Sequence, residues 1–209
     1  MRLYSYWRST TSYRVRIALN LKGVAFRTVP VNLATGEQYS PEFSALNPAR
    51  GVPVLELEDG TALTQSLAII DYLEGIRPEP ALLPARQPAR ARVMAAAHVV
   101  ALDIHPVNNL RVVQRLKEMG HSQEDTVGWM NHWMNEGLSA FQAMIRYDTP
   151  FSFGEQPGLA DICLVAQLYN ARRWSLDLAP FARLTGIERN CLALEAFARA
   201  HPEAQPDAA

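Results

Sequence analysis

The sequence predicts an α/β domain followed by an all-α domain. Short apolar–polar alternation, which is typical of strands, is confined to the first 80 residues. The segment RPEPALLPARQP at residues 77–88 then interrupts the pattern with four prolines. Beyond it, apolar residues recur at helical spacing and no convincing strand follows. We therefore expect one domain at residues 1–80 and a second, helical domain at residues 88–209.

The first domain is expected to have the order β-α-β-α-β-β-α. Its elements, in chain order, are a strand at 2–6, a helix at 12–22, a strand at 25–33, a short helical or loop segment at 40–48, a hairpin at 54–64 and a helix at 66–76. Asp59-Gly60 is typical of the hairpin turn, and Ser66 is a plausible N-cap for the last helix. In the first helix, Arg14 and Arg16 are expected to lie away from the centre of the apolar stripe. A strand–helix–strand unit followed by a hairpin predicts a mixed sheet with helices packed on it.

Four helices are expected in the second domain. They cover residues 89–120 with an irregularity at Pro106, 122–147, 159–174 and 186–200. In the second of these helices, Trp129, Met130 and Trp133 are core candidates. The closing residues HPEAQPDAA are expected to be loosely ordered.

Composition excludes several classes of protein. With 20 basic and 21 acidic residues the net charge is −1, so no global field would attract nucleic acid or an anionic membrane surface. No segment has the length and apolarity of a signal peptide or a membrane span, and we expect a cytoplasmic protein. Cys163 and Cys191 lie in apolar helical patterns and are expected to be buried and reduced. His98 and His105 share a helix face, but no third ligand accompanies them, so no metal site is expected.

The segment WRSTTSYRVRIAL, from Trp7 to Leu19, is the most unusual stretch. It places four hydroxyl residues between an expected strand and an expected helix, where exposed backbone N–H groups and the helix dipole favour an anion. A helix cap needs only one hydroxyl. The alternative is that Thr11 or Ser12 caps the helix and the other hydroxyls only fill the loop.

Several segments resemble one family. LYSYWRSTTSYRVRIALNLKG closely resembles the signature of zeta-class glutathione transferases, with matches at Arg8, Ser9, Arg14, Arg16 and the following IAL. Further segments that resemble this class are LNPARGVPVLE, LTQSLAIIDYLE, ALLP, DIHPVNNLRVV and HPEAQPD. The resemblance implies a thioredoxin-like N-terminal domain that binds glutathione, an all-helical C-terminal domain that binds substrate, and a homodimer.

The resemblance also implies roles for residues of the first domain. Ser9 occupies the position of the catalytic serine, and Thr10 and Thr11 replace a serine and a cysteine found in many members. Which of these three hydroxyls contacts the glutathione sulfur stays open. Val52 would present its backbone to glutathione beside a cis bond to Pro53, the alternative being an ordinary trans proline. The two residues expected to bind the γ-glutamyl carboxylate are Gln65 and Ser66.

In the second domain, the resemblance places His105 and Asn109 near glutathione and substrate, with Asn108 nearby. Arg173 corresponds to the arginine that binds a substrate carboxylate; Arg8 is the second candidate and Arg111 a weaker third. The alternative is that Arg172 and Arg173 form a solvated helix face. Many members begin the helix at 159 with Thr-x-x-Asp, where this chain has Gly158, so a glycine cap is expected.

The activity implied by the resemblance is glutathione-dependent cis–trans isomerisation of a maleyl diacid in aromatic catabolism. Glutathione thiolate would add to the cis-enone carbon, the former double bond would rotate, and elimination would give the fumaryl form. The sequence does not choose between maleylacetoacetate and maleylpyruvate. One alternative is a general zeta-class transferase that conjugates or dehalogenates small electrophiles such as α-halo acids, and another is a non-enzymatic binding scaffold.

Overall fold

The computed structural model describes residues 1–208, and the chain folds into two compact units. Unit 1 comprises residues 1–81 together with the segment from Leu192 onward, and unit 2 comprises residues 82–191. The domain limits expected from the sequence, 1–80 and 88–209, followed the change from strands to helices along the chain. The structure divides the chain differently, because the helix after Leu192 packs on the first helix of unit 1.

Unit 1 contains a four-stranded mixed sheet. Its strands are β1 (Arg2–Ser5), β2 (Arg27–Pro30), β3 (Val54–Glu56) and β4 (Ala62–Thr64), in the spatial order β2-β1-β3-β4. β1 pairs with β2 in parallel and with β3 antiparallel, so that Leu3 lies opposite both Thr28 and Leu55. β3 and β4 form the expected hairpin, with Gly60 at φ +86° in its turn. The predicted mixed sheet is therefore confirmed.

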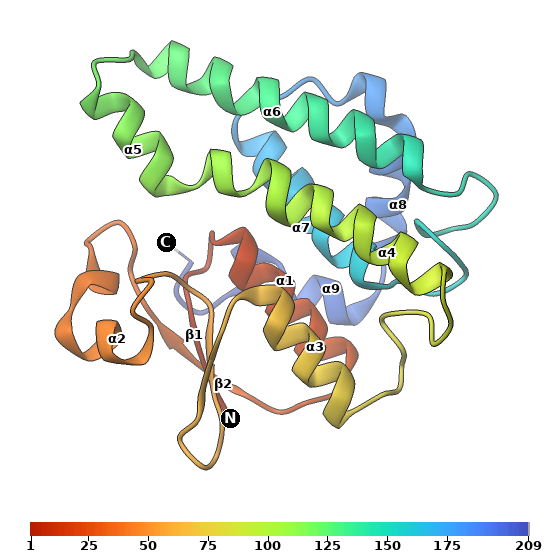
Figure 1. Ribbon diagram of the computed structural model, residues 1–209, viewed down its shortest axis with the longest axis horizontal. Coiled ribbons are helices and arrows are strands. Elements are labelled where there is room, and N and C mark those ends of the chain that lie inside the picture. The colour runs from red at the N-terminus through yellow and green to blue at the C-terminus, as the bar shows by residue number, and fades with distance from the viewer. Residues whose placement is uncertain (209) are drawn as a thin grey trace. The chain divides into compact units, whose positions relative to one another are not determined.

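The helices of unit 1 are α1 (Thr10–Leu21), α2 (Pro41–Leu46), α3 (Ser66–Ile76) and α9 (Glu195–Ala200), with short 3₁₀ turns at Glu37–Tyr39 and Pro202–Ala204. α1 packs against both α3 and α9, and α1 and α3 run side by side in Figure 1. The expectation that Arg14 and Arg16 lie off the buried face was wrong, since each is only 1 % exposed. The neighbours on more than one side of α1 explain why its arginines are buried as well as its apolar residues.

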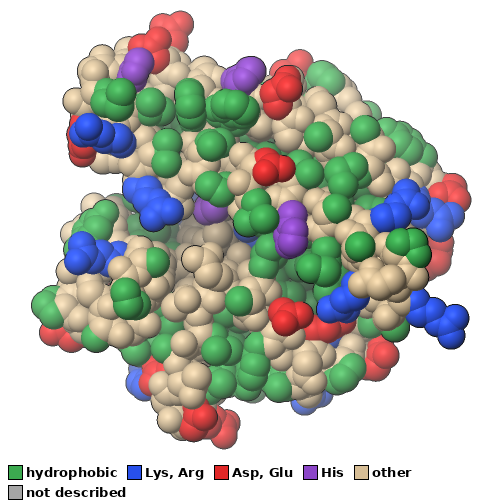
Figure 2. Space-filling model, in the orientation of Figure 1, with side chains coloured by type: hydrophobic (Ala, Val, Ile, Leu, Met, Phe, Trp, Pro, Cys, Tyr) green, Lys and Arg blue, Asp and Glu red, His purple; other side chains and the backbone are tan. Residues whose placement is uncertain are grey.

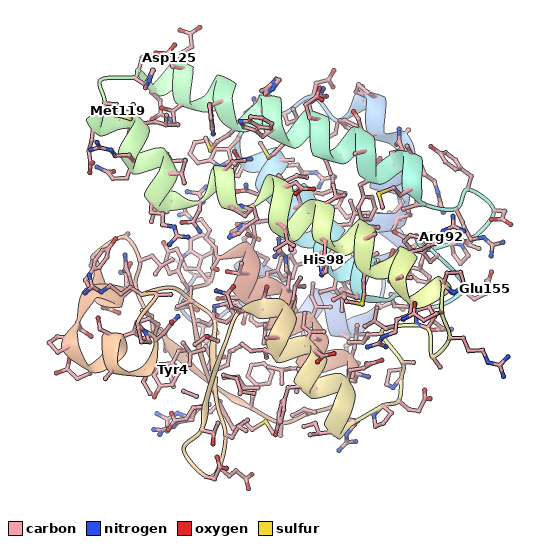
Figure 3. All side chains as sticks on the ribbon, in the orientation of Figure 1. Tyr4, Arg92, His98, Met119, Asp125 and Glu155 are labelled. Carbon is pink, nitrogen blue, oxygen red and sulfur yellow. The ribbon has the colours of Figure 1, made fainter. Side chains whose placement is uncertain are left out.

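Unit 2 is helical. Its elements are α4 (Ala89–His98), a π-helical segment (Val99–Ile104), 3₁₀ turns at Pro106–Asn108 and Ala179–Phe181, α5 (Leu110–Glu118), α6 (Gln123–Met144), α7 (Leu159–Arg173) and α8 (Ala182–Leu192). α7 is buried along most of its length and packs against α4 and the π-helical segment. α5 and α6 are joined by a tight turn with Met119 on one side and Asp125 on the other (Figure 3).

Several expectations for the helical part need correction. The helix expected at 89–120 is broken into four pieces around Pro106, and the helix expected at 186–200 is two helices, α8 and α9. Met130 is buried, whereas Trp129 is 37 % exposed. The closing segment is ordered through residue 208: it forms a 3₁₀ turn, and Asp207 accepts a hydrogen bond from the backbone N–H of Trp7. Hydrophobic periodicity along the chain could not predict these features, because they depend on tertiary contacts.

One close approach in unit 2 requires a glycine. A Cβ atom at Gly137 of α6 would lie 2.5 Å from Cδ1 of Ile104 and still closer to its Cγ1. Ile104 is fully buried and closes the π-helical segment. The missing side chain at Gly137 therefore allows α6 to pack directly on the segment that leads into His105.

Cys163 and Cys191 are both buried, as expected, and they form no disulfide with each other. Burial raises the pKa of the Cys191 thiol far above its ordinary value, which keeps this side chain uncharged. On the face shown in Figure 2, acidic and basic side chains are interspersed with apolar ones, in keeping with the net charge of −1. Within residues 1–208, no helix is both long enough and apolar enough to cross a membrane.

Candidate functional site

The turn between β1 and α1 is capped by Ser9. Ser9 has extended backbone angles, φ −68° and ψ 119°, and its Oγ accepts a hydrogen bond from the backbone N–H of Ser12 at 3.2 Å. The alternative in which Thr11 or Ser12 caps the helix is therefore wrong. The first turn of α1 has no acidic side chain, so the positive end of the helix dipole is not neutralised within the helix.

The hydroxyls at this turn form a chain. Thr11 Oγ1 donates to the carbonyl oxygen of Val52 at 2.9 Å, and Ser9 Oγ lies 2.8 Å from Thr11 Oγ1. Thr11 has a single hydroxyl proton and donates it in the hydrogen bond to Val52. Ser9 is therefore the donor in the hydrogen bond between Ser9 and Thr11. Ser9 and Thr11 are half-buried, whereas Thr10 is only 6 % exposed. The structure thus separates two accessible hydroxyls from one that is turned inward.

The segment that Thr11 contacts contains a cis peptide bond between Val52 and Pro53, as expected. Pro53 is buried and leads directly into β3, whereas Val52 is half-buried. The Thr11–Val52 hydrogen bond therefore joins the start of α1 to the half-buried backbone that leads into β3, and extended backbone of this kind can pair with a peptide.

The start of α3 has an unusual backbone. Gln65 occupies the N-cap position with φ 68° and ψ 118°, and Ser66 is the first helical residue rather than the expected cap. A positive φ at a residue other than glycine costs about 1–3 kcal/mol and occurs most often at functional sites. Ser66 Oγ accepts from Nη1 of the buried Arg14 at 3.5 Å. A helix N-terminus with a guanidinium beneath it favours binding of a carboxylate.

Arg8 lies in the loop immediately before Ser9. Its guanidinium carbon is 4.2 Å from the ring centroid of Trp7, a cation–π arrangement, and Trp7 is 8 % exposed. The Nε atom of Arg8 is buried and has no hydrogen-bond partner within residues 1–208. A buried guanidinium N–H without an acceptor is suited to a ligand that brings one.

In unit 2, the segment at residues 105–109 is tied to α6. Asn108 Nδ2 donates to the carbonyl of Met130 at 3.2 Å, and Trp129 Nε1 donates to the carbonyl of Val107 at 2.8 Å. Next to them, Asn109 Nδ2 lies 3.4 Å from His105 Nε2. An amide N–H can only donate, so this bond requires an unprotonated Nε2 on His105.

Asn109 has a second, structural role. It is the N-cap of α5, and its Oδ1 accepts from the backbone N–H of Arg111 at 3.2 Å. Arg111 itself is exposed on that helix. The two residues expected to approach ligand, His105 and Asn109, therefore lie next to each other within unit 2, in the irregular segment that contains Pro106.

The two arginines at the end of α7 differ. Arg172 donates from Nη1 and Nη2 to the two carboxylate oxygens of Glu188, each at 2.5 Å, and Glu188 is 5 % exposed. Both arginines are exposed, so the alternative of a solvated helix face stays open, but this bidentate pair distinguishes Arg172 from its neighbour. Arg173 is exposed, and its guanidinium carbon lies 5.0 Å from the ring centroid of Trp174. Of the two arginines, Arg172 forms the ion pair with Glu188 and Arg173 does not take part in it.

Sequence reasoning missed two contributors. It placed Arg14 off the buried face, although Arg14 lies beneath the start of α3 at Ser66, and it did not foresee the left-handed backbone at Gln65. The available signal was a pair of arginines in an otherwise apolar helix, which implies buried acceptors. No sequence pattern marks a left-handed glutamine.

Comparisons with known proteins identify the family of the chain. The family model "Glutathione S-transferase, N-terminal domain" matches residues 8–76. The chain is 50 % identical to the maleylacetoacetate isomerase of Rhizobium meliloti, covering 96 % of this chain and 95 % of the relative. It is 44 % identical to the maleylpyruvate isomerase of a Ralstonia species, with both chains covered completely.

Two solved structures are closely similar. One is the holo structure of a maleylpyruvate isomerase described as a bacterial zeta-class glutathione S-transferase, with a TM-score of 0.97, 44 % identity and full coverage of both chains. The other is the maleylacetoacetate isomerase of Anaeromyxobacter dehalogenans with GSH bound in its active site, with a TM-score of 0.90, 44 % identity, and coverage of 100 % and 97 %. On these identities over the whole length, the chain belongs to the zeta-class glutathione transferases, the family that includes the maleylacetoacetate and maleylpyruvate isomerases.

Proposed function

We propose that this protein is a glutathione-dependent isomerase that converts a maleyl diacid, maleylacetoacetate or maleylpyruvate, into its fumaryl form. The observation that carries the proposal is the hydroxyl chain from Ser9 through Thr11 to the Val52 carbonyl, at the uncompensated N-terminus of α1. Relatives named for this isomerisation align over nearly the whole chain, which favours it over a general conjugating or dehalogenating transferase.

The described residues fit glutathione. The backbone of Val52, beside the cis bond to Pro53, offers a peptide edge for its central residue. The N-terminus of α3, with Ser66 and Gln65, suits the γ-glutamyl carboxylate. The related A. dehalogenans isomerase has GSH bound in its active site, which supports the same ligand here.

Bound glutathione would supply a thiolate nucleophile for reversible addition to the cis double bond, which would allow that bond to rotate before elimination. Ser9 can turn its O–H from Thr11 toward this sulfur while its oxygen still accepts from Ser12. Thr11 stays bound to Val52 and holds the turn, and the inward position of Thr10 leaves it the least suited of the three. A free thiol has a pKa of about 8.5, and lowering that pKa by about two units favours the thiolate by roughly 2.7 kcal/mol.

Arginines recognise the diacid. Arg8 has a buried Nε that lacks an acceptor within residues 1–208, and Arg173 corresponds, by the family resemblance, to the arginine that binds a substrate carboxylate. Each presents a planar guanidinium suited to a carboxylate, and each can stabilise the enolate-like charge that develops as the sulfur adds. His105 and Asn109 supply a neutral hydrogen-bonding pair toward glutathione and substrate.

The test is spectrophotometric. Maleylacetoacetate and maleylpyruvate are generated separately and their isomerisation is followed with and without glutathione, for the wild type, Arg173→Ala and the matched control Arg189→Ala, which removes an exposed arginine from α8. We expect glutathione-dependent turnover that Arg173→Ala lowers at least 100-fold and Arg189→Ala leaves unchanged. The faster substrate identifies the diacid. Glutathione binding without turnover of either diacid would exclude the isomerase and favour the conjugating transferase.

Ser9→Ala and Thr11→Val assign the hydroxyls. Thiolate absorbance of bound glutathione, measured against pH, reports the thiol pKa directly. We expect Ser9→Ala to raise that pKa by one unit or more, because it removes the donor. Thr11→Val keeps the shape of the side chain and should raise the pKa less, since its hydroxyl serves Val52. A larger shift for Thr11→Val would reverse the assignment.

We also propose that the protein is a cytoplasmic homodimer. The support is its family membership together with large apolar side chains that stay exposed in the single chain, among them Leu102 at 58 % and Ile76 at 47 %. Light scattering coupled to size-exclusion chromatography should give twice the mass of 23.3 kDa. A mass of one chain at micromolar concentration would contradict the dimer.

A further inference from the structure

Within unit 1, the loop at residues 6–9 meets a segment nearly 200 residues away in the sequence. The backbone N–H of Trp7 donates to Oδ2 of Asp207 at 3.0 Å, and the carbonyl of Trp7 accepts from Nη2 of Arg16 at 2.9 Å. Both polar groups of this residue's backbone are therefore held by side chains from outside the loop. This loop carries Arg8 and Ser9.

Arg16 connects the loop to the end of α9. It is 1 % exposed, and its Nε donates to the carbonyl of Ala200 at 3.0 Å. Its Nη1 donates to Oγ of Ser5 at 3.0 Å and to the carbonyl of Tyr6 at 3.4 Å. One buried guanidinium thus links the last residue of β1, the loop and the last residue of α9.

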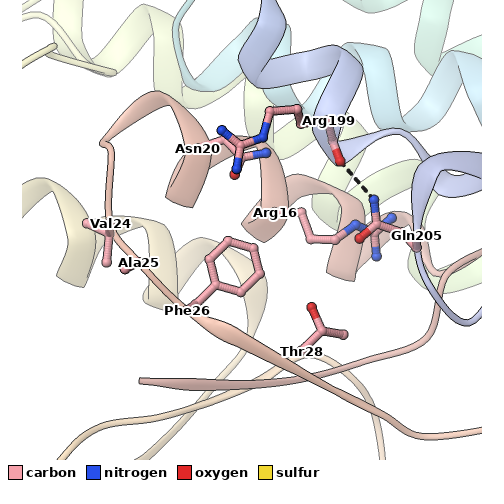
Figure 4. A pocket seen from close by; sticks show the side chains of 8 residues that line it. All are labelled: Arg16, Asn20, Val24, Ala25, Phe26, Thr28, Arg199 and Gln205. Carbon is pink, nitrogen blue, oxygen red and sulfur yellow. Dashed lines mark hydrogen bonds between the residues drawn. The ribbon is translucent and has the colours of Figure 1, made fainter.

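The segment at residues 199–207 is held in place by its own hydrogen bonds and by a ring contact, so Asp207 has a defined position. Gln205 Nε2 donates to the carbonyls of Arg199 and His201, each at 2.9 Å, and Figure 4 shows the first of these bonds beside the stem of Arg16. The ring of His201 meets the ring of Tyr13 edge to face, with centroids 6.0 Å apart. A cavity of about 330 Å³ lies between this segment, α1 and the start of β2.

We propose that the segment at residues 199–207 positions the loop at residues 6–9, and that Asp207 is a positioning residue for Ser9 and Arg8. The proposal rests on the proposed function, because it takes the roles of Ser9 and Arg8 from there. A charged carboxylate makes a stronger hydrogen bond to a backbone N–H than a neutral acceptor does. Trp7 also lies under the Arg8 guanidinium, so a shift of Trp7 moves the arginine with it.

The position of this loop matters because catalysis tolerates little displacement. A misplacement of about 1 Å at a reacting group can cost about 100-fold in rate. Removing the Asp207 carboxylate deletes one of the two hydrogen bonds on Trp7 and leaves the Arg16 bond intact. We therefore expect a partial loss of turnover. Glutathione affinity should change little, because Val52 and Ser66 are held by contacts that do not involve Asp207.

The experiment uses the full chain with three variants. Asp207→Ala removes the acceptor, Asp207→Asn keeps an acceptor oxygen, and Glu203→Ala is the matched control, since that carboxylate lies in the same segment and contacts His201 at 2.6 Å. The readouts are kcat, KM for glutathione, and the thiol pKa of bound glutathione from thiolate absorbance. Asp207→Ala should lower kcat about 10-fold and raise that thiol pKa, with KM for glutathione changed less than about threefold. Asp207→Asn should lower kcat less than Asp207→Ala does, because it keeps an acceptor oxygen without the charge. Glu203→Ala should stay within about twofold of the wild type.

The outcomes separate the two proposals. If Asp207→Ala keeps the kcat and the thiol pKa of the wild type, the positioning role is overturned. An equal loss of kcat in Glu203→Ala also overturns it, because that result indicates general damage to the segment. A wild type that turns over neither diacid refutes the proposed function instead; the thiol pKa of bound glutathione still tests Asp207 in that case. If Asp207→Ala does not fold by circular dichroism, Asp207→Ser removes the same carboxylate and takes its place.

Discussion

Gly137→Ala should destabilise the protein although alanine is the better helix former. An alanine Cβ at this position would lie 2.5 Å from Cδ1 of Ile104, where carbon atoms prefer at least about 3.5 Å, so the overlap is about 1 Å and is larger at Cγ1. Ile104 is fully buried, so its side chain cannot relieve the overlap by turning into solvent. Overpacking of this kind costs about 1–3 kcal/mol, whereas the gain in helix propensity is about 1 kcal/mol. The net effect should be a loss of up to about 2 kcal/mol.

The same helix provides a matched control. Gly128 of α6 is exposed, and a Cβ there would meet nothing within 4 Å. Gly128→Ala should therefore show the propensity gain alone, about 0.5–1 kcal/mol of added stability. The difference between the two variants isolates the contact with Ile104, and for a chain of this size each kcal/mol corresponds to about 2–4 °C in Tm.

Thermal unfolding followed by circular dichroism measures both variants, and a third variant completes the cycle. Ile104→Ala removes the two closest atoms, so Gly137→Ala should lose its cost in that background and approach the effect of Gly128→Ala. Two results would refute the reasoning: a Gly137→Ala variant as stable as the wild type, or an unchanged cost after Ile104→Ala.

Two further predictions concern carboxylates. Asp161 is 2 % exposed, and its carboxylate accepts hydrogen bonds from the backbone N–H groups of Ser152 and Gly158, each at 2.8 Å. Asp161→Ala should therefore lower the free energy of unfolding, measured by chemical denaturation, by about 2–4 kcal/mol. A loss below about 1 kcal/mol would show that water replaces the carboxylate. For Glu56, hydrogen bonds from Arg2 first and a tyrosine hydroxyl second hold its pKa below the ordinary 4.5, so its contribution to stability is present above pH 4.5 and is lost as the pH falls below that value. Glu56→Gln should reduce the loss of unfolding free energy as the pH falls below 4.5. An unchanged pH dependence would show that other carboxyl groups cause this loss.

Local chemistry explains why much of the fold could be predicted. The strand alternation, the Asp59-Gly60 turn and the proline-rich segment at 77–88 are signals that act over a few residues. Each is present in the structure as a strand, a hairpin or a linker, because short-range backbone preferences decide it. The predictions failed where packing decided: the π-helical segment before His105, the exposure of Trp129, and the separation of α8 from α9.

The candidate site shows the same division. The hydroxyl cluster at 9–12 indicated an anion site, because any strand-to-helix turn of that composition offers N–H groups and hydroxyls. The cluster did not indicate the role of each hydroxyl. The roles of Ser9 and Thr11 differ only because the carbonyl of Val52, more than 40 residues away in the sequence, accepts the hydrogen bond that Thr11 donates.

Short-range signals in the sequence were enough to predict the order of elements in the first 80 residues, the mixed sheet, a helical second part, and motifs that indicate the family. Only the tertiary structure decided that Arg14 and Arg16 are buried, that Arg172 rather than Arg173 is engaged by Glu188, and that residues 199–207 brace the loop carrying Ser9. The physical reason is that a helical period or a turn signal describes a residue's neighbours along the chain. A buried guanidinium or carboxylate is defined by acceptors and donors that folding brings from distant positions.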